Sequence, residues 1–164
     1  MLQAIRKRME DDKGFTLIEL MVVVLIIAIL IAIAIPTFLG LRQRAQDRAA
    51  QSDLRNGLTA AKAWYTDGDT YAGFNETEGE AIEPSLDWVA GGVASTTANL
   101  AVSVGVGTTN SADDTVGLSR MSASGTCFHI SDVSTNPGAG TFRNSGGGCT
   151  GAAAVGMTSS DGSW

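Results

Sequence analysis

The stretch Phe15-Thr16-Leu17-Ile18-Glu19-Leu20, which opens the apolar run FTLIELMVVVLIIAILIAIAI of residues 15–35, decides the fold of this chain. The run holds a single charged side chain, Glu19. About twenty apolar residues in a helix span roughly 30 Å, the thickness of the hydrocarbon core of a bilayer. A secretory signal peptide has a shorter apolar region, followed by small residues suited to cleavage. The run therefore predicts one membrane helix that stays on the mature protein.

The charges before this run predict its orientation. Four basic side chains precede it: Arg6, Lys7, Arg8 and Lys13. By the positive-inside tendency, the N-terminus is expected in the cytoplasm and the part after Pro36 outside it. That exported part holds both cysteines, Cys127 and Cys149. In an oxidising compartment such a pair predicts one disulfide, which would stabilise the fold by about 3 kcal/mol; two free thiols are the alternative.

Residues 37–65 continue with helical spacing. An apolar stripe recurs at steps of four, three and four residues: Leu54, Leu58, Ala61 and Tyr65. Pro36 lacks a backbone donor and marks a kink or a weak point, although a membrane helix can run through it. A helix over residues 15–65 would be about 75 Å long. A small domain cannot cover that length, so lipid or other copies of the chain must bury about half of it.

The remainder of the chain has a different composition. Residues 66–99 are rich in Gly, Asp and Glu and are expected to form an irregular connection. Alternating apolar residues then predict a strand over 100–106, and further strand candidates are 115–121 and 126–131. Phe128 and Ile130 share one strand face, which we expect to meet the helix stripe. The Gly-rich segment after Asp132 is expected to be looped.

These elements predict an α+β fold, in which one long N-terminal helix packs by its second half on a small antiparallel sheet. The expected division of the chain has five parts: a cytoplasmic leader (1–14) that is removed, a transmembrane or filament-core helix (15–36), an amphipathic helix of the head (37–65), an irregular connecting loop (66–99) and a β-rich C-terminal part with a disulfide-closed loop (100–164).

The octapeptide Lys13-Gly14-Phe15-Thr16-Leu17-Ile18-Glu19-Leu20 resembles the processing site of type IV prepilins and the related pseudopilins. The resemblance is close over residues 13–36, including Pro36, weaker along the helix to Tyr65, and limited to the general layout beyond it. In that family a membrane aspartyl peptidase cuts after the glycine, and the new N-terminal residue is methylated. The resemblance implies cleavage between Gly14 and Phe15 and N-methylation of Phe15.

Glu19 has two interpretations. An ionisable group in a membrane segment is costly and should have a partner. The resemblance implies that this partner is the Phe15 amine of a neighbouring subunit. Thr16 and Glu19 also have the spacing of a capping box, in which the carboxylate supports the first helical turn of its own chain. The spacing leaves both interpretations open.

Other side chains give weaker signals. His129 is the only histidine and is expected on the polar face of a strand. The acidic pair Asp113-Asp114 is a weak calcium candidate and a better candidate for a turn. Asn75-Glu76-Thr77 fits a glycosylation sequon, which makes Asn75 a weak modification site. We find no nucleophile–base pair, phosphate-binding loop or set of metal ligands, so the sequence predicts no enzyme, no metal and no cofactor.

The leading hypothesis is a structural subunit of a type IV pilus, processed at Gly14 and assembled through its helix for adhesion, motility or surface attachment. The expected partners are other copies in a helical homopolymer, the prepilin peptidase and methyltransferase, the assembly machinery, and the lipid bilayer before assembly. The precursor is expected in the cytoplasmic membrane and the assembled pilus outside the cell. Residues 66–164 hold eleven acidic and two basic side chains, so no direct nucleic-acid binding is expected.

Two other functions compete with this hypothesis. The chain could be a pseudopilin of a type II secretion or competence system, because the processing site is common to both groups. It could also be a single-pass membrane anchor with a ligand-binding head, which would never be processed or assembled.

Overall fold

The computed structural model describes residues 14–157, 159–161 and 164. The leader predicted over residues 1–14 therefore lies outside the described residues except for Gly14. The chain forms two compact units, one up to Leu41 and one over Arg42–Trp164, and each is considered by itself below. The helix α2, Leu17–Gly68, begins in the first unit and ends in the second.

Pro36 lies inside α2 and does not end it. The helix lacks the bond that an amide at position 36 would make to the Ala32 carbonyl, and the Thr37 hydroxyl donates to the next carbonyl, that of Ile33, at 3.2 Å. The helix continues three residues past the predicted end at Tyr65. It stops where Asp69 takes a left-handed conformation, with φ 51°, and its amide donates to the Tyr65 carbonyl at 2.7 Å.

The second unit contains a five-stranded sheet in the order β1-β2-β3-β4-β5. Its strands are β1 Trp88–Ala90, β2 Val102–Gly107, β3 Thr115–Met121, β4 Cys127–Val133 and β5 Gly140–Ser145. Neighbours from β2 to β5 pair antiparallel, as predicted. β1 pairs parallel to β2, which corrects the fully antiparallel prediction. The reason is the connection over residues 91–101, which returns the chain to the same end of the sheet.

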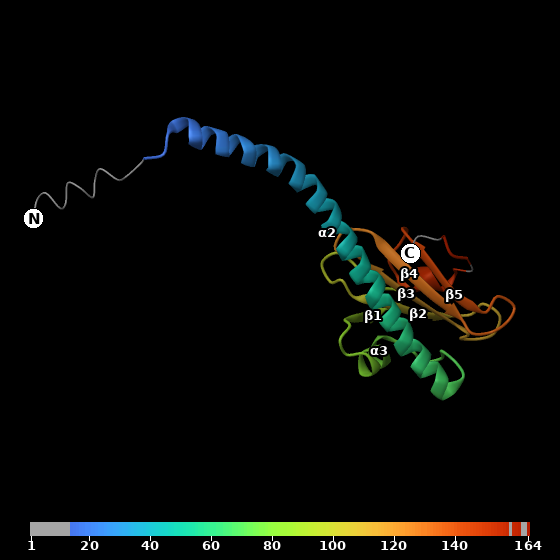
Figure 1. Ribbon diagram of the computed structural model, residues 1–164. Helices are drawn as coiled ribbons and strands as arrows, with labels where there is room; N and C mark the ends of the chain where they lie inside the picture. The colour runs from blue at the N-terminus through green and yellow to red at the C-terminus, as the bar shows by residue number, and fades with distance from the viewer. Residues whose placement is uncertain (1–13, 158, 162–163) are drawn as a thin grey trace, which may run out of the picture. The chain divides into compact units, whose positions relative to one another are not determined.

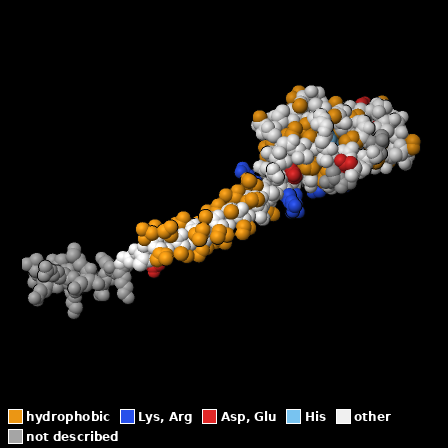
Figure 2. Space-filling view, turned by 90° about the horizontal axis from the view of Figure 1, so that it is seen from above, with side chains coloured by type: hydrophobic (Ala, Val, Ile, Leu, Met, Phe, Trp, Pro, Cys, Tyr) orange, Lys and Arg blue, Asp and Glu red, His pale blue; other side chains and the backbone are white. Residues whose placement is uncertain are grey.

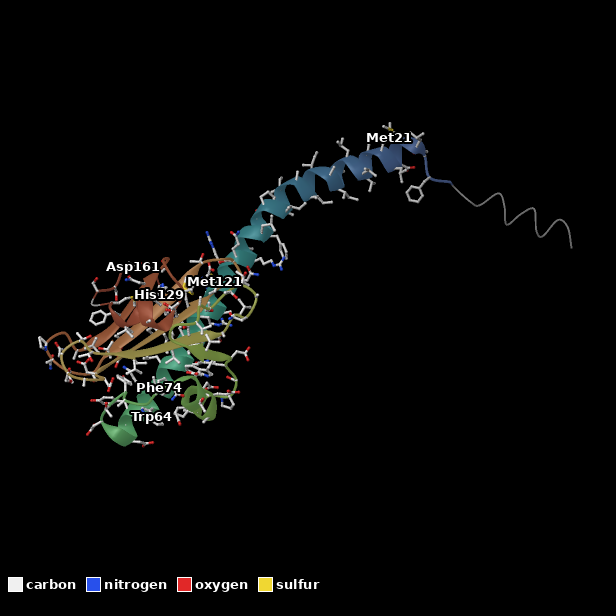
Figure 3. All side chains as sticks on the ribbon, turned by 180° about the vertical axis from the view of Figure 1, so that it is seen from behind. Met21, Trp64, Phe74, Met121, His129 and Asp161 are labelled. Atoms are coloured by element: carbon white, nitrogen blue, oxygen red, sulfur yellow. A yellow bond between two sulfur atoms is a disulfide. The ribbon has the colours of Figure 1, made fainter. Side chains whose placement is uncertain are left out.

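The main core lies between α2 and one face of this sheet (Figure 1). Leu54 is fully buried on α2, and Leu118 and Ile130 are fully buried on facing positions of β3 and β4. Phe128 and Ile130 belong to the same cluster as the helix stripe, so the predicted contact is confirmed. Trp64 packs against Phe74 in this cluster, with ring centroids 6.2 Å apart (Figure 3). The predicted α+β fold, with the long helix on a sheet, is thereby confirmed.

The segment predicted to be looped after Asp132 instead contains β5 and a short helix, α4 Gly151–Val155. α4 covers the other face of β2 and β3. Its backbone lies directly on the strands because glycines face it: a Cβ on Gly105 would come within 2.8 Å of the Ala152 nitrogen, and one on Gly117 would overlap the Val155 nitrogen. Within the segment predicted to be looped, Gly151 is likewise required for this packing, because a Cβ there would overlap the Gly105 nitrogen, whereas Gly146, Gly147 and Gly148 lie outside helices and strands as predicted.

The connection predicted to be irregular over residues 66–99 also contains regular structure, namely α3 Glu76–Ile82 and β1. Asn75 caps α3, because its side-chain oxygen accepts from the amides of Thr77 and Glu78 at 2.9 and 3.2 Å. α3 then packs on β1 through Gly79, where a Cβ would lie 2.7 Å from the Trp88 ring. Both elements are too short for their sequence periodicity to be recognised.

Candidate functional site

The candidate site is the first turn of α2 with the residues before it. Gly14 is exposed, and a Cβ added there would meet nothing within 4 Å. Phe15 is 86% exposed. The backbone on both sides of the Gly14–Phe15 bond is thus open in the part of this segment that the structure describes, while Lys13 lies outside the described residues. This is the accessibility that proteolysis of the bond requires.

Glu19 closes a capping box with Thr16. The Thr16 backbone amide and hydroxyl both donate to Oε2 of Glu19, at 2.9 and 2.7 Å. In return, the Glu19 amide donates to the Thr16 hydroxyl oxygen at 3.3 Å. The carboxylate also lies at the positive end of the helix dipole. Within a single chain, the local interpretation of Glu19 is therefore realised, and the described hydrogen bonds leave Oε1 for a further donor.

The first unit presents an apolar surface over the whole of its helix. Every large hydrophobic side chain described between Leu17 and Leu41 is about half exposed or more, whereas Leu54 in the second unit is fully buried. Figure 2 shows hydrophobic side chains covering the visible side of this segment. Among the described residues, α2 is the one helix long and apolar enough to cross a membrane. Such a surface is not stable in water and must be covered by lipid or protein.

A buried carboxylate connects α2 to the sheet of the second unit. Asp132 on β4 accepts from Lys62 at 2.8 Å, from the Tyr71 hydroxyl at 2.7 Å and from the Thr141 hydroxyl at 2.5 Å. These side chains border a surface cleft of about 480 Å³. Burial alone would raise the pKa of Asp132, but the hydrogen bonds outweigh it and lower that pKa. The same burial, with Asp132 beside it, raises the pKa of Tyr71.

This cluster was not predicted, since its members come from segments far apart in the sequence. Each oxygen of the Asp132 carboxylate accepts from a side chain of another segment, Oδ1 from Lys62 and Thr141 and Oδ2 from Tyr71. We therefore assign it a structural role: it fixes the C-terminal part of α2 to β4 and β5. The sequence gives one weak indication of this cluster: Lys62 is the only lysine after the leader.

His129 lies on a polar strand face, as expected, opposite Ser119 and Asn144, but that face is buried (Figure 3). α4 and the disulfide loop cover that face. The two ring nitrogens of His129 lie 2.6 Å from the Ser119 hydroxyl and 2.6 Å from the Gly146 carbonyl. The loop is closed by the Cys127–Cys149 disulfide, with Cα atoms 5.6 Å apart. His129 thus joins two strands and the loop, and both of its nitrogens are occupied.

The acidic pair Asp113-Asp114 forms a turn before β3. Asp113 has φ 55°, and the Asp114 carboxylate accepts from the amides of Thr109, Asn110 and Ser111 at 2.7 to 3.1 Å. Burial opposes the charge on Asp114, but these bonds and one from the Thr135 hydroxyl hold its pKa below the usual range. Within the described residues, no group of three or more His, Cys, Asp or Glu side chains could hold a metal ion.

The comparisons with known proteins agree with this geometry. The prokaryotic N-terminal methylation motif matches residues 9–35. The type IV wide pilus major component PilA4 of Thermus thermophilus is 37% identical over 103 residues, which are 63% of this chain and 71% of that protein. The type IV major pilin protein PilA of Myxococcus xanthus is 44% identical over 72 residues, or 44% of this chain and 33% of the relative.

A secretion protein is also similar. The type II secretion system core protein G of Vibrio cholerae is 42% identical over 48 residues, which are 29% of this chain and 33% of that protein. The similarity thus spans about a third of the Myxococcus and Vibrio relatives and most of the Thermus one. No solved structure matches the chain at a significant level. Since the methylation motif is present and 37% identity covers 71% of the Thermus pilus component, this chain belongs to the type IV pilin family, whose relatives include the pseudopilins of type II secretion.

Proposed function

We propose that the chain is a structural subunit of a type IV pilus, which is cut after Gly14 and assembled through its N-terminal helix into an extracellular filament. Such a filament would serve adhesion, motility or surface attachment. The observation that carries the proposal is the exposed apolar surface of α2 up to Leu41, with Glu19 in its first turn. The similarity to a wide pilus major component of Thermus and a major pilin of Myxococcus supports it.

The apolar surface has two possible environments, the bilayer and a bundle of identical helices. Both bury it, because lipid tails are as apolar as leucine, so apolar burial alone does not drive the chain from one to the other. The charged Glu19 distinguishes them. In the bilayer its carboxylate is costly, whereas in a bundle Oε1 can accept from the Phe15 amine of an adjacent copy. Pairing of Glu19 with Phe15 would therefore favour the filament and set the register of entry.

Pro36 has a role in the same proposal. Because it removes a backbone donor from the middle of α2, the hydrogen bonds around it are the weakest part of that helix. The helix can adjust there when a subunit leaves the bilayer and packs among its neighbours. The Thr37 hydroxyl, bonded to the Ile33 carbonyl, would retain one contact during such an adjustment.

The proposed partners are those that the chain meets as it passes from the membrane into the filament. The precursor lies in the cytoplasmic membrane with its N-terminus inside, where the prepilin peptidase and methyltransferase reach Gly14 and Phe15. The assembly machinery of the membrane then extracts the mature chain, and other copies of the chain surround it in the pilus. The role is structural and not catalytic, in line with the pilin family.

The pseudopilin function is the second candidate, because of the similarity to the Vibrio secretion protein. We favour the pilin, since the similarity to the Thermus pilus component extends well beyond α2. Filaments sheared from cells and analysed by electron microscopy and peptide mapping test the choice. We expect this chain as the main protein of the filaments. If filaments are shed in normal amounts with only traces of it, the proposal of a major pilin subunit is wrong.

A further inference from the structure

One side of α2 in the second unit is basic. Arg44, Arg48 and Arg55 are exposed, and their spacing of four and seven residues places them on one face of the helix. Arg55 lies over the ring of Trp164, 5.4 Å from its centroid, and the Trp164 ring nitrogen donates to the Asn144 carbonyl on β5. This face of α2, the arginine flank, is thus directed to the β5 edge of the sheet.

The opposite side of the same unit is acidic. α3 carries Glu76, Glu78 and Glu80 and packs on β1, the other edge strand. Figure 1 shows α3 and β1 on one side of α2, with β4 and β5 on the other. We call these three glutamates the glutamate flank. The helix dipole accounts for Glu76 and Glu78 in the first turn of α3 but not for Glu80.

Neither flank is neutralised within the chain. The two ion pairs among the described residues are Lys62–Asp132 and Arg120–Asp53, so no member of either flank takes part in one. Arg44 and Arg48 are four residues apart on one helix, as are Glu76 and Glu80 on another. Like charges at this spacing repel each other by a few tenths of a kcal/mol. A neighbour of opposite charge would relieve both repulsions.

The placement of the flanks determines the kind of partner. A two-fold dimer brings the same patch of both subunits together, which would oppose like charges here. Arginines of one copy can instead meet glutamates of the next, which leaves one flank open at each end. Such a heterologous contact repeats, and it produces a helical filament when the rotation does not close.

We propose that the arginine flank of each head docks on the glutamate flank of a neighbouring copy in the filament. This inference rests on the proposed pilus function and names a surface and a partner for it. The contact acts on register and subunit order more than on affinity, since exposed ion pairs contribute little each and are screened by salt.

A charge exchange tests the contact. The variants Arg44→Glu/Arg48→Glu and Glu76→Lys/Glu80→Lys reverse the two flanks at matched spacing and touch no ion pair of the described residues. Each alone should lower the yield of sheared filaments about tenfold, because two attractions become repulsions. The variant with all four changes should restore most of the yield. Normal yield from either reversal, or no recovery in the combined variant, would overturn the proposal.

Zero-length coupling identifies the contact directly. After processing, Lys62 is the only lysine of the chain, and its bond to Asp132 provides an internal positive control for carbodiimide coupling. The variant Arg48→Lys keeps the positive charge and is expected to form filaments like the wild type. In these filaments, we expect mass spectrometry to find position 48 linked to residues 76–80 of another copy. The link should disappear when Glu76, Glu78 and Glu80 are changed to Gln. Filaments that give only the Lys62–Asp132 link would exclude the contact, yet leave the pilus function intact.

The tests also separate this inference from the function on which it rests. Loss of filaments in the arginine reversal alone, with the glutamate reversal normal, would assign the arginines to a different anionic partner such as lipid headgroups and would overturn the contact. Absence of the wild-type chain from sheared filaments would overturn the proposed function and the contact together.

Discussion

Thr16 and Glu19 bind each other reciprocally in the first turn of α2: two donors of Thr16 lie 2.9 and 2.7 Å from Oε2 of Glu19, and the Glu19 amide lies 3.3 Å from the Thr16 hydroxyl oxygen. This box shows that Glu19 has a local role in the isolated chain. It does not explain why the residue is charged, since an uncharged glutamine can accept the same hydrogen bonds.

The variant Glu19→Gln separates the two roles. It keeps the cap, so we expect normal insertion and normal cleavage after Gly14. Filament yield should fall by about tenfold or more, because the Phe15 amine of the neighbouring subunit loses a charged partner in an apolar environment. Immunoblots of membrane and sheared fractions measure both outcomes.

The matched control for this change is Thr16→Ala, which weakens the cap and keeps the carboxylate. We expect near-normal filament yield from it. If Glu19→Gln assembles normally, or if Thr16→Ala fails equally, the charge of Glu19 has no specific part in assembly.

Removal of the disulfide tests what the bridge contributes to the stability of the second unit. The double variant Cys127→Ser/Cys149→Ser opens a loop of 21 residues and should lower the free energy of unfolding by about 3 kcal/mol. Denaturant unfolding of the detergent-solubilised chain, followed by tryptophan fluorescence, reports on this unit because Trp64, Trp88 and Trp164 all lie in it. An unchanged midpoint would mean that the β-sheet and α4 hold the loop without the bridge.

Asp114 predicts a dependence of stability on pH. Its pKa is lower in the folded chain than in the unfolded one, so the stabilisation is present above the unfolded value of about 3.9 and is lost as the pH falls through the folded value. Asp114→Asn should cost about 1.5–3 kcal/mol at pH 7, through its bonds to three backbone amides. The loss should shrink at pH 3, when measured by denaturant unfolding. An equal loss of stability at both pH values would contradict the predicted direction of the pH dependence.

The close packing of α4 on the sheet predicts that Gly117→Ala is destabilising. Its methyl group would overlap the Val155 backbone nitrogen, which cannot move as a side chain does, so we expect a loss of about 1–3 kcal/mol. Gly148→Ala is the control, because nothing lies within 4 Å of a methyl group there. Equal unfolding midpoints of the two variants would show that α4 does not pack as described.

Much of the fold could be predicted because its signals are local. The apolar run and the stripe around Leu54 and Leu58 predicted α2, and β3 has the predicted bounds, Thr115–Met121. The capping box was also predictable from the spacing of two neighbouring residues. The burial of His129 was not, since it depends on α4, which in turn depends on glycines in three separate segments.

The other features that could not be predicted from the sequence also depend on contacts between distant segments. Asp132 meets Tyr71 and Lys62, which lie 61 and 70 positions earlier in the chain, so no local pattern indicates their contact. β1 holds only three residues, and its parallel pairing is decided by the loop that follows it. Likewise, the separation of the arginine and glutamate flanks appears only when the sheet places β1 and β5 at opposite edges.

The most direct test of the account is the intact mass of this chain in purified, sheared filaments. We predict a single major species that begins at Phe15, one methyl group heavier than the unmodified sequence from that residue. A filament chain that begins at Met1, or filaments that lack the chain altogether, would contradict the proposal that cleavage after Gly14 prepares it for assembly.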